Sequence, residues 1–218
     1  GRAATLYESS LGAEAAVDGW RLEGPGRIAH RDGWMEVRSE RPEGPQGHVV
    51  FWCPHVFPER WVAEWDFALL EPKGLCIVFF AAQGRHGRDL FDPSLGPRDG
   101  VFRQYTLGDI DCYHISYFAN TPDVPRAVAN LRKNHGFYLL SNGPVGVPVA
   151  KAGTVHRALL VKDGAHVSMA VDGRRIIDYV DDGIRAGPVW GQGRIGLRQM
   201  QWTVARYRNF RVSELEGR

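Results

Sequence analysis

Cysteine is scarce in this chain of 218 residues, and its three cysteines, Cys53, Cys76 and Cys112, lie far apart. No two of them form a CxxC pair, which excludes a zinc ribbon or a thioredoxin-type site. Each lies in an apolar, strand-like run, so we predict buried free thiols. Free thiols favour a reducing compartment, and we expect a cytoplasmic protein. Secretion or a periplasmic location stays open, because a signal peptide is removed from the mature chain.

Long hydrophobic runs and an excess of one charge are also absent. No stretch approaches the roughly 18 consecutive apolar residues of a transmembrane helix. The 27 basic and 25 acidic side chains leave a net charge of +2, without a basic run. We therefore expect neither a membrane nor a nucleic-acid partner. The GxSxG, HExxH, P-loop and GxGxxG motifs are missing too, so serine-hydrolase, zincin and nucleotide-binding sites lack support.

Glycine and proline, with 26 and 13 residues, punctuate many short strand-like runs. The clearest are His156–Lys162, His166–Val171 and Arg174–Val180, which two Asp-Gly turns join into a β-meander. No segment keeps a helical apolar period, so the pattern predicts one all-β domain over residues 1–218, a sandwich or a barrel. The other strands that we expect are Arg27–His30, Trp34–Ser39, His48–Cys53, Trp61–Leu69, Leu75–Ala82, Val101–Thr106, Cys112–Phe118, Phe137–Ser141, Arg194–Gln199 and Ala205–Val212.

Two long irregular stretches interrupt this pattern, Gly84–Gly100 and Thr121–Asn134. Loops of this length are uncommon inside a compact domain and often line a functional site. An ordinary surface excursion is the alternative interpretation of both.

Side chains two residues apart on a strand share a face. His48 and Trp52 therefore share a face of their strand, which we expect to be partly open. Glu64 and Asp66 are likewise neighbours on one face of the next strand. A pair of carboxylates is what a glycoside hydrolase requires, and two acids on a solvated face are the simpler interpretation.

A second group of residues gathers between positions 103 and 135, rich in His, Tyr, Arg, Gln and Asn and poor in acids. An Arg or Lys with a Gln or Asn can hold the carboxylate of a uronate, and a Tyr or His can remove the neighbouring proton. These are the requirements for β-elimination from an acidic sugar. Aromatic rings such as Trp52, Tyr105 and Tyr117 offer stacking surfaces for sugars. The candidates in this group are Gln104, Tyr105, His114, Tyr117, Asn130, Arg132, Lys133 and His135.

Three further acids, Asp178, Asp181 and Asp182, offer oxygen ligands for a structural Ca²⁺. Their spacing matches no EF-hand, and a solvated turn is the simpler interpretation. We predict no metal centre and no cofactor.

The chain contains the runs 47–54 (GHVVFWCP), 64–67 (EWDF), 74–82 (GLCIVFFAA), 113–118 (YHISYF), 130–133 (NLRK), 197–200 (LRQM) and 207–210 (YRNF). With these runs the sequence resembles the bacterial domain-of-unknown-function family 1961, over roughly Leu6 to Val212. The resemblance implies a concanavalin A-like jelly roll, in which two curved antiparallel sheets form a concave face. Some members are encoded beside genes for the breakdown of pectic rhamnogalacturonan, which implies work on carbohydrate. The family supplies no catalytic residues to transfer.

These observations favour a carbohydrate-active enzyme, a lyase acting on a uronate-containing glycan. In this hypothesis His114 or Tyr117 is the base and acid, and Arg132, with Lys133, holds the carboxylate. The assisting residues are Gln104 and Asn130, with His48 and Trp52 on the floor and Tyr105 and His135 nearby. The alternatives are a glycoside hydrolase that uses Glu64 and Asp66, and a lectin-like module without activity. The sugar, its linkage and the oligomeric state stay open.

Overall fold

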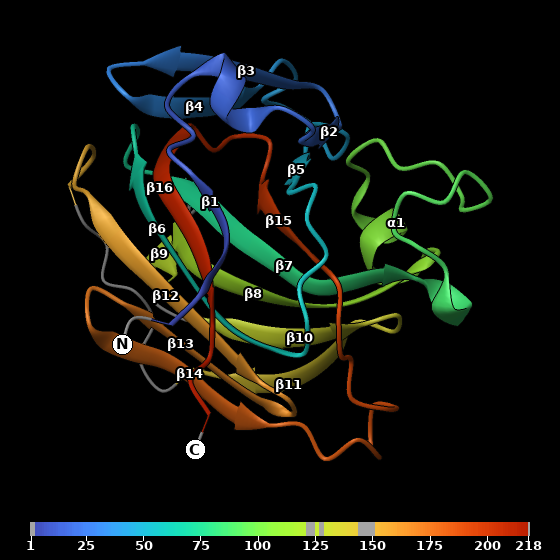
Figure 1. Cartoon of the computed structure of the whole chain (residues 1–218). Helices are drawn as coiled ribbons and strands as arrows, with labels where there is room; N and C mark the ends of the chain where they lie inside the picture. The colour runs from blue at the N-terminus through green and yellow to red at the C-terminus, as the bar shows by residue number, and fades with distance from the viewer. Residues whose placement is uncertain (1–2, 121–124, 127–128, 144–150, 218) are drawn as a thin grey trace.

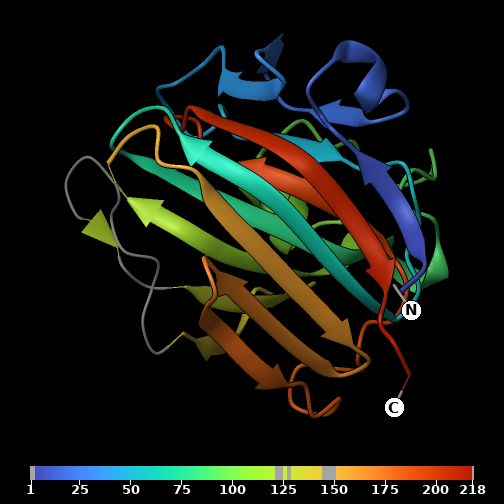
Figure 2. The ribbon, with the colours of Figure 1, turned by 60° about the vertical axis from the view of Figure 1, so that its left-hand side comes forward.

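The computed structural model describes residues 3–120, 125–126, 129–143 and 151–217, which form two antiparallel sheets facing one another (Figure 1). Sheet A contains β1 (Thr5–Ser9), β3 (Gly26–Arg31), β4 (Trp34–Ser39), β6 (Arg60–Leu69), β12 (His156–Asp163), β13 (His166–Val171), β14 (Arg174–Val180) and β16 (Ala205–Glu214). Its strand order is β14-β13-β12-β6-β16-β4-β3, and β1 pairs with β16. Figure 2 turns this sheet towards the viewer.

Sheet B contains β2 (Arg21–Glu23), β5 (Val49–Trp52), β7 (Gly74–Gly84), β8 (Ile110–Asn120), β9 (Pro125–Arg126), β10 (Asn130–Asn134), β11 (Tyr138–Asn142) and β15 (Arg194–Gln199). Its order is β11-β10-β8-β7-β15-β5-β2, and β9 pairs with β8. The only helical segments described are η1 (Glu14–Val17), η2 (Arg85–Gly87) and α1 (Phe102–Thr106). The chain crosses between the sheets from β5 to β6, from β6 to β7 and from β15 to β16, as in a jelly roll. The predicted two-sheet sandwich and the β-meander, β12–β13–β14, are confirmed.

The main core lies between the two sheets and follows the predicted alternation. On β6, Trp61, Trp65 and Phe67 are buried against sheet B, while Glu64 and Asp66 point outwards. Burial of aromatic and branched side chains removes apolar surface from water and is the largest favourable term in folding. The period-two pattern of the sequence therefore predicts which residues hold the sheets together.

The three cysteines are buried free thiols, as predicted. Burial raises the pKa of Cys53, Cys76 and Cys112 to about 12. A thiol with such a pKa is inert as a nucleophile near neutral pH, so the cysteines serve packing.

A second apolar cluster lies on the outer face of sheet B, the face turned away from sheet A. It is covered by residues 85–109, which connect β7 to β8 and which we call the strap. Leu90, Leu95 and Tyr105 of the strap pack onto Phe79 and its neighbours on the sheet. The predicted long loop therefore covers one face of the sandwich.

The strap also contains α1, where the prediction of a strand over Val101–Thr106 is wrong. Two apolar residues three apart, Phe102 and Tyr105, face the sheet on one turn, whereas Arg103 between them is exposed. The helical spacing of these anchors over a sheet overrides the local preference for a strand.

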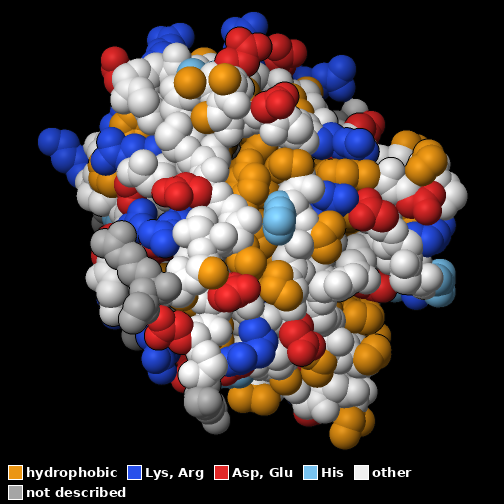
Figure 3. Space-filling view, viewed as in Figure 1, with side chains coloured by type: hydrophobic (Ala, Val, Ile, Leu, Met, Phe, Trp, Pro, Cys, Tyr) orange, Lys and Arg blue, Asp and Glu red, His pale blue; other side chains and the backbone are white. Residues whose placement is uncertain are grey.

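The other differences between the predicted and the observed elements are small. The predicted irregular stretch Thr121–Asn134 contains β9 and β10, and its residues 121–124 and 127–128 lie outside the described residues. The short strands β1 and β2 were not predicted. No helix in the described part of the chain is long and apolar enough to cross a membrane. On the face shown in Figure 3, basic and acidic side chains lie interspersed, in keeping with the balanced composition.

Candidate functional site

The register of sheet B arranges the side chains of its outer face in rows that run across the strands. One row contains Trp52, Gly196, Phe79, His114 and Arg132. The row beside it contains Val50, Arg198, Ile77, Ser116 and Asn130. Three predicted site residues, His114, Arg132 and Asn130, therefore share this face with Arg198, which the sequence did not single out.

Arg198 is the central charged residue of these rows, and only 1% of its surface is exposed. Its Nη2 lies 2.6 Å from Nδ1 of His48, whereas its Nε and Nη1 have no hydrogen-bond partner among the described residues. No carboxylate of the described chain lies within ion-pair distance of this guanidinium. Burial lowers the pKa of Arg198 to about 10, so it keeps its charge at neutral pH.

Three aromatic rings surround the guanidinium. Its Cζ lies 5.0 Å from the ring of Phe102, 5.2 Å from Tyr105 and 5.5 Å from Phe79. Such contacts offset part of the desolvation of a cation, but they leave its N–H donors without acceptors. A buried arginine with two orphaned nitrogens is costly to the fold, and an anionic ligand would supply the acceptors it lacks.

Two neutral imidazoles accompany Arg198. Burial and the charge of Arg198 lower the pKa of His48 to about 4. Burial and the charges of Arg198 and Arg132 lower the pKa of His114 to about 3. Nδ1 of His114 lies 2.8 Å from the side-chain nitrogen of Asn134, whose Oδ1 has no partner among the described residues. Both rings are therefore uncharged at neutral pH.

A network around Glu23 fixes the strap to the edge strand β2 through Arg98 and Tyr105. Arg98 donates from Nε and Nη2 to the two carboxylate oxygens, each at 3.0 Å. Oε1 also accepts from Trp52 Nε1 at 2.8 Å and from the Tyr105 hydroxyl at 2.9 Å. This fully satisfied carboxylate ties the strap to β2 and β5.

The C-terminal end of the strap is fixed to the turn between β10 and β11. The amide of Gly136 donates to the carbonyl of Thr106 at 2.8 Å, and Nδ1 of His135 donates to the carbonyl of Gly108 at 2.8 Å. In the same turn, the ring of Phe137 packs edge-to-face on Phe102 at 5.2 Å. The strap therefore crosses the outer face of sheet B from β2 to β10.

Arg132 lies at the margin of this cover. Its guanidinium is stacked 3.9 Å from the ring centre of Phe137, and its Nη1 donates to the Phe137 carbonyl at 3.2 Å. It is half-buried, whereas Arg198 is closed off. The predicted carboxylate holder is thus already engaged, whereas Nε and Nη1 of the buried Arg198 have no hydrogen-bond partner among the described residues.

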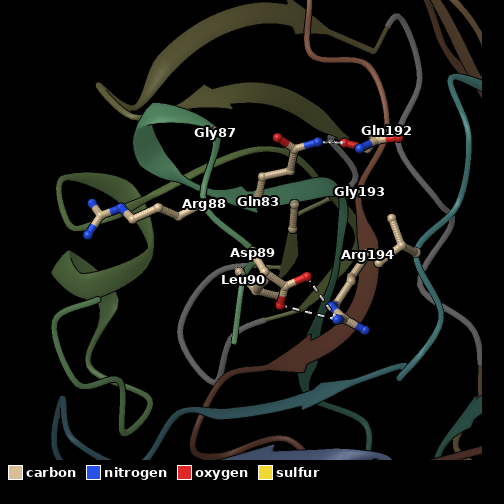
Figure 4. Close-up of a pocket in the computed structure, with 10 residues that line it drawn as sticks. Gln83, Gly87, Arg88, Asp89, Leu90, Gln192, Gly193 and Arg194 are labelled. Carbon is tan, nitrogen blue, oxygen red and sulfur yellow. Dashed lines mark hydrogen bonds and ion pairs between the residues drawn. The ribbon is translucent and has the colours of Figure 1, made fainter. Parts of the chain in front are cut away.

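At least four hollows are lined by strap residues, among them one of about 730 Å³ between the strap and β2. One, of about 190 Å³, is shown in Figure 4; there Arg194 Nη2 donates to both oxygens of Asp89, and Gln83 donates to the carbonyl of Gln192. In the same view Arg88 points away from this ion pair. The hollow therefore holds a closed ion pair and no free carboxylate.

A second hollow, of about 380 Å³, has the predicted residues Gln104 and His135 in its lining. The Gln104 amide donates to Asp99 Oδ1 and accepts from the Asp99 backbone, both at 2.8 Å. The lining includes neither His114 nor Arg198, so the structure separates Gln104 and His135 from the arginine.

The expectation of a partly open sheet surface at His48 and Trp52 needs correction. The alternation gives the correct face, but the strap covers it, and 4% of His48 and none of Trp52 is exposed. The Trp52 ring is stacked on Phe79 at 5.5 Å, which in turn is stacked on Tyr105 at 5.6 Å. Neither Trp52 nor Tyr105 offers a free ring to a sugar.

Tyr117 and Lys133 also lie away from His114, because their strands turn them to the inner face. Tyr117 is buried in the main core and accepts a hydrogen bond from Trp65 Nε1 at 3.3 Å. Lys133 is fully buried between the sheets and pairs with Asp181 at 2.7 Å. The structure therefore does not bring Tyr117 or Lys133 into one site with His114 and Arg132.

Glu64 and Asp66 lie on the outer face of sheet A, where both are paired. Arg157 lies 3.1 Å from Glu64 and 2.9 Å from Asp66, and Arg208 lies 3.2 Å from Asp66. Burial raises the pKa of Asp66, but hydrogen bonds from Asn209, Arg157 and Arg208 outweigh it and hold the pKa below its ordinary value. Asp66 therefore lacks the raised pKa that a general acid needs, and both carboxylates are already paired with arginine.

The three acids considered for Ca²⁺ take different partners. Asp181 binds Lys133, Asp178 binds His166 at 2.6 Å, and Asp182 accepts from backbone amides of its own turn. No group of three metal-ligating residues occurs in the described part of the chain.

Gly196 shows how closely this face is packed, and it yields a test. A Cβ at this position would lie 2.5 Å from the ring of Trp52. Gly196→Ala should therefore lower the free energy of unfolding by about 1–3 kcal/mol through overpacking, measured by urea titration. Gly96→Ala is the control, because the nearest atom to its Cβ is 3.8 Å away. Equal stabilities of the two variants would show that Trp52 does not lie flat over Gly196.

The two sheets and their crossings define a β-sandwich of the jelly-roll class with a galectin-like arrangement. The chain belongs to the family described as a domain of unknown function (DUF1961), which matches residues 4–212 and confirms the resemblance noted in the sequence. It is 41% identical over 214 residues to the uncharacterised protein YesU of Bacillus subtilis (strain 168), covering 97% of this chain and 96% of YesU.

Two solved structures are similar to this chain in fold over most of their length. A protein of unknown function with a galectin-like fold from Bacillus subtilis is 40% identical, with a TM-score of 0.91 and coverage of 100% of this chain and 99% of that chain. The carbohydrate-binding module CBM66 from Bacillus subtilis is 14% identical, with a TM-score of 0.60 and coverage of 90% and 96%. At that identity, CBM66 shares the fold alone.

Proposed function

We propose that this protein binds an acidic glycan on the outer face of sheet B and cleaves it by β-elimination. The observation that carries the proposal is Arg198, a buried guanidinium with two unpartnered nitrogens, in contact with the neutral imidazole of His48 and on the same face of sheet B as that of His114. CBM66, which shares the fold, is by name a carbohydrate-binding module, and this supports a sugar as the ligand.

Arg198 supplies the recognition. A guanidinium presents parallel N–H donors that match the two oxygens of a carboxylate, and such pairs are strong where water is excluded. The two nitrogens without partners, Nε and Nη1, are available for this contact. Neutralising a uronate carboxylate also makes the proton on the adjacent carbon easier to remove, because the enolate-like charge of the transition state is stabilised.

His114 is the residue that we assign as the base. It takes the proton from the carbon beside the carboxylate, the electrons of that C–H bond form a carbon–carbon double bond, and the bond from the next carbon to the glycosidic oxygen breaks. The imidazolium then returns the proton to the departing oxygen. For Nε2 to accept the proton, the Asn134 amide must present its oxygen to Nδ1 of His114, a half-turn that also gives the unpartnered Oδ1 a donor.

A second candidate is a binding module without activity. It is favoured by Tyr105, the tyrosine nearest to Arg198, whose hydroxyl is committed to Glu23 and is not free to act as an acid. The hydrolase has less support, because Glu64 and Asp66 are paired on the other sheet.

The test is digestion of uronate polymers and oligosaccharides, such as polygalacturonate and alginate, followed by ultraviolet absorbance of the unsaturated product. We expect His114→Gln to lower the rate by about 10²-fold, as for loss of a general base. His166→Gln is the matched control, because His166 is exposed and pairs with Asp178 on sheet A. Reducing ends without ultraviolet absorbance would overturn elimination, and calorimetric binding without any product would leave the binding module.

A further inference from the structure

A hollow of about 370 Å³ lies away from the strap, where the crossings from β6 to β7 and from β15 to β16 meet. Its walls come from the end of β4 and the segment after it, and from the residues of these two crossings. The described residues that line it include neither Arg198 nor any residue of the strap. This hollow, which we call the Trp202 hollow, is therefore separate from the site proposed above, and its volume lies in the range of small-molecule sites, about 300–1,000 Å³.

Trp202, in the turn between β15 and β16, is the aromatic residue of this hollow. It is half-buried, yet among the described residues its ring contacts no aromatic ring or cation, and its indole nitrogen has no hydrogen-bond partner. Each of the other six tryptophans has such a contact. Trp202 therefore offers an apolar ring and an N–H donor that the fold does not use.

The neighbouring residue, Gln201, also lines the hollow and supplies an acceptor. Its Oε1 is buried and has no hydrogen-bond donor among the described residues. A buried carbonyl oxygen of this kind destabilises the fold unless water or a ligand donates to it. A ligand hydroxyl is a donor of the required kind.

The turn that presents these two side chains is fixed to the start of β7. The hydroxyl of Thr203 accepts from the amide of Leu75 at 2.9 Å, and the amide of Met200 donates to the carbonyl of Leu75 at 3.1 Å. Thr203 is fully buried. Gln201 and Trp202 are therefore held in place before a ligand arrives, which lowers the entropy lost on binding.

Four charged side chains complete the lining, two basic and two acidic. They are Arg38, Lys73, Glu43 and Glu71, and none of them has an ion-pair or hydrogen-bond partner for its side chain among the described residues. Their charges cancel, so the hollow favours neither an anion nor a cation. A sugar hydroxyl both donates and accepts, and can therefore bond to basic and acidic groups alike.

From these observations we infer that the Trp202 hollow is a second binding site, which takes a neutral sugar unit of a glycan. The apolar face of the sugar stacks on Trp202, one hydroxyl donates to Oε1 of Gln201, and the charged side chains bond to the remaining hydroxyls. The site binds without changing the sugar, and it does not depend on the proposed cleavage at Arg198.

The experiment is electrophoresis in native gels that contain a neutral polysaccharide, with galactan, arabinan, galactomannan and xyloglucan tested in turn. We expect at least one of them to retard the protein. Trp202→Ala should weaken the binding at least tenfold, because the stacking surface is lost, whereas Trp202→Phe should keep most of it. Gln201→Leu should weaken it about three- to tenfold through loss of one hydrogen bond, without loss of stability in urea titrations.

Two further variants are the controls. Tyr138→Ala removes an aromatic side chain of β11 that is 48% exposed, and Arg198→Met alters the other site; both should be retarded as strongly as the unaltered protein. Retardation by polygalacturonate but by no neutral polysaccharide would overturn the inference. So would retardation that survives in Trp202→Ala or is lost in Arg198→Met. Absence of unsaturated product from uronate polymers, which contradicts the proposed cleavage, would leave this inference standing.

Discussion

Arg198→Met is expected to abolish the cleavage of acidic glycans. The variant should nevertheless be at least as stable as the unaltered protein. The guanidinium is 1% exposed, has no carboxylate partner in the described chain and leaves two nitrogens without acceptors. Replacing a buried charge by an apolar side chain of similar length removes its desolvation cost and is often neutral or stabilising by about 1–4 kcal/mol. The loss of the carboxylate contact should lower kcat/KM by about 10³-fold.

A fall in kcat/KM together with unchanged or higher stability would show that Arg198 binds a ligand and is not needed for the fold. Rates are followed by ultraviolet absorbance, and the free energy of unfolding by urea titration. Arg206→Met is the control, because its guanidinium also lies over an aromatic ring, Trp34 at 4.4 Å, but on sheet A. Arg198→Lys should recover only part of the rate, since an ammonium keeps the charge but lacks the two-pronged geometry. A large loss of stability in Arg198→Met with normal rates would assign Arg198 to the fold alone.

Much of the sandwich could be predicted from period-two alternation. The pattern assigns Trp65 and Phe67 to the core and Glu64 to the outside, because one face of each strand must be apolar. The same parity separates His114 from Tyr117, three positions apart on one strand, and Arg132 from its neighbour Lys133. Grouping these residues by their closeness in the sequence overlooked this separation.

The alternation of polar and apolar residues along a strand cannot show whether another segment of the chain covers one face of the sheet. His48 and Trp52 are assigned to the correct face of β5, yet their burial depends on a strap that begins more than thirty positions later. Arg198 was missed for the same reason. Its place in the expected strand Arg194–Gln199 is visible, but a charged side chain at an outward position is ordinarily solvated. The packing of Phe102 and Tyr105 over it turns an ordinary arginine into a buried one with two unpartnered nitrogens.

Two buried lysines between the sheets should respond in opposite ways to replacement by methionine. Lys133 of β10 donates to Asp181 at 2.7 Å and to the Gly187 carbonyl at 2.8 Å. Lys162 of β12 donates to the Gly164 carbonyl at 2.8 Å and has no carboxylate within ion-pair distance among the described residues. Both ammonium groups lie near the ring of Tyr113, at 5.7 and 5.9 Å.

Lys133→Met should lower the free energy of unfolding by about 3–5 kcal/mol, because it leaves Asp181 buried without its cation. Burial raises the pKa of Asp181, but hydrogen bonds from Lys133 and Tyr113 outweigh it and hold the pKa below its ordinary value. Without Lys133, burial still disfavours the ionised Asp181 carboxylate, and the hydrogen bond from Lys133 no longer offsets this effect. Asp181→Asn in the same chain should restore part of the loss, since the double variant buries no unpaired charge.

Lys162→Met should instead raise the free energy of unfolding by about 1–3 kcal/mol at neutral pH. Burial lowers the pKa of Lys162 from 10.5 to about 8, against the opposing pull of Glu59 and Asp181. Between these two values the unfolded chain holds a proton that the folded chain has released, so the stability of the unaltered protein rises with pH across this window. The rise should be smaller in Lys162→Met, as urea titrations at pH 7 and at about pH 10 would show. A destabilised Lys162→Met, or an unchanged slope with pH, would mean that Lys162 is solvated or paired in solution.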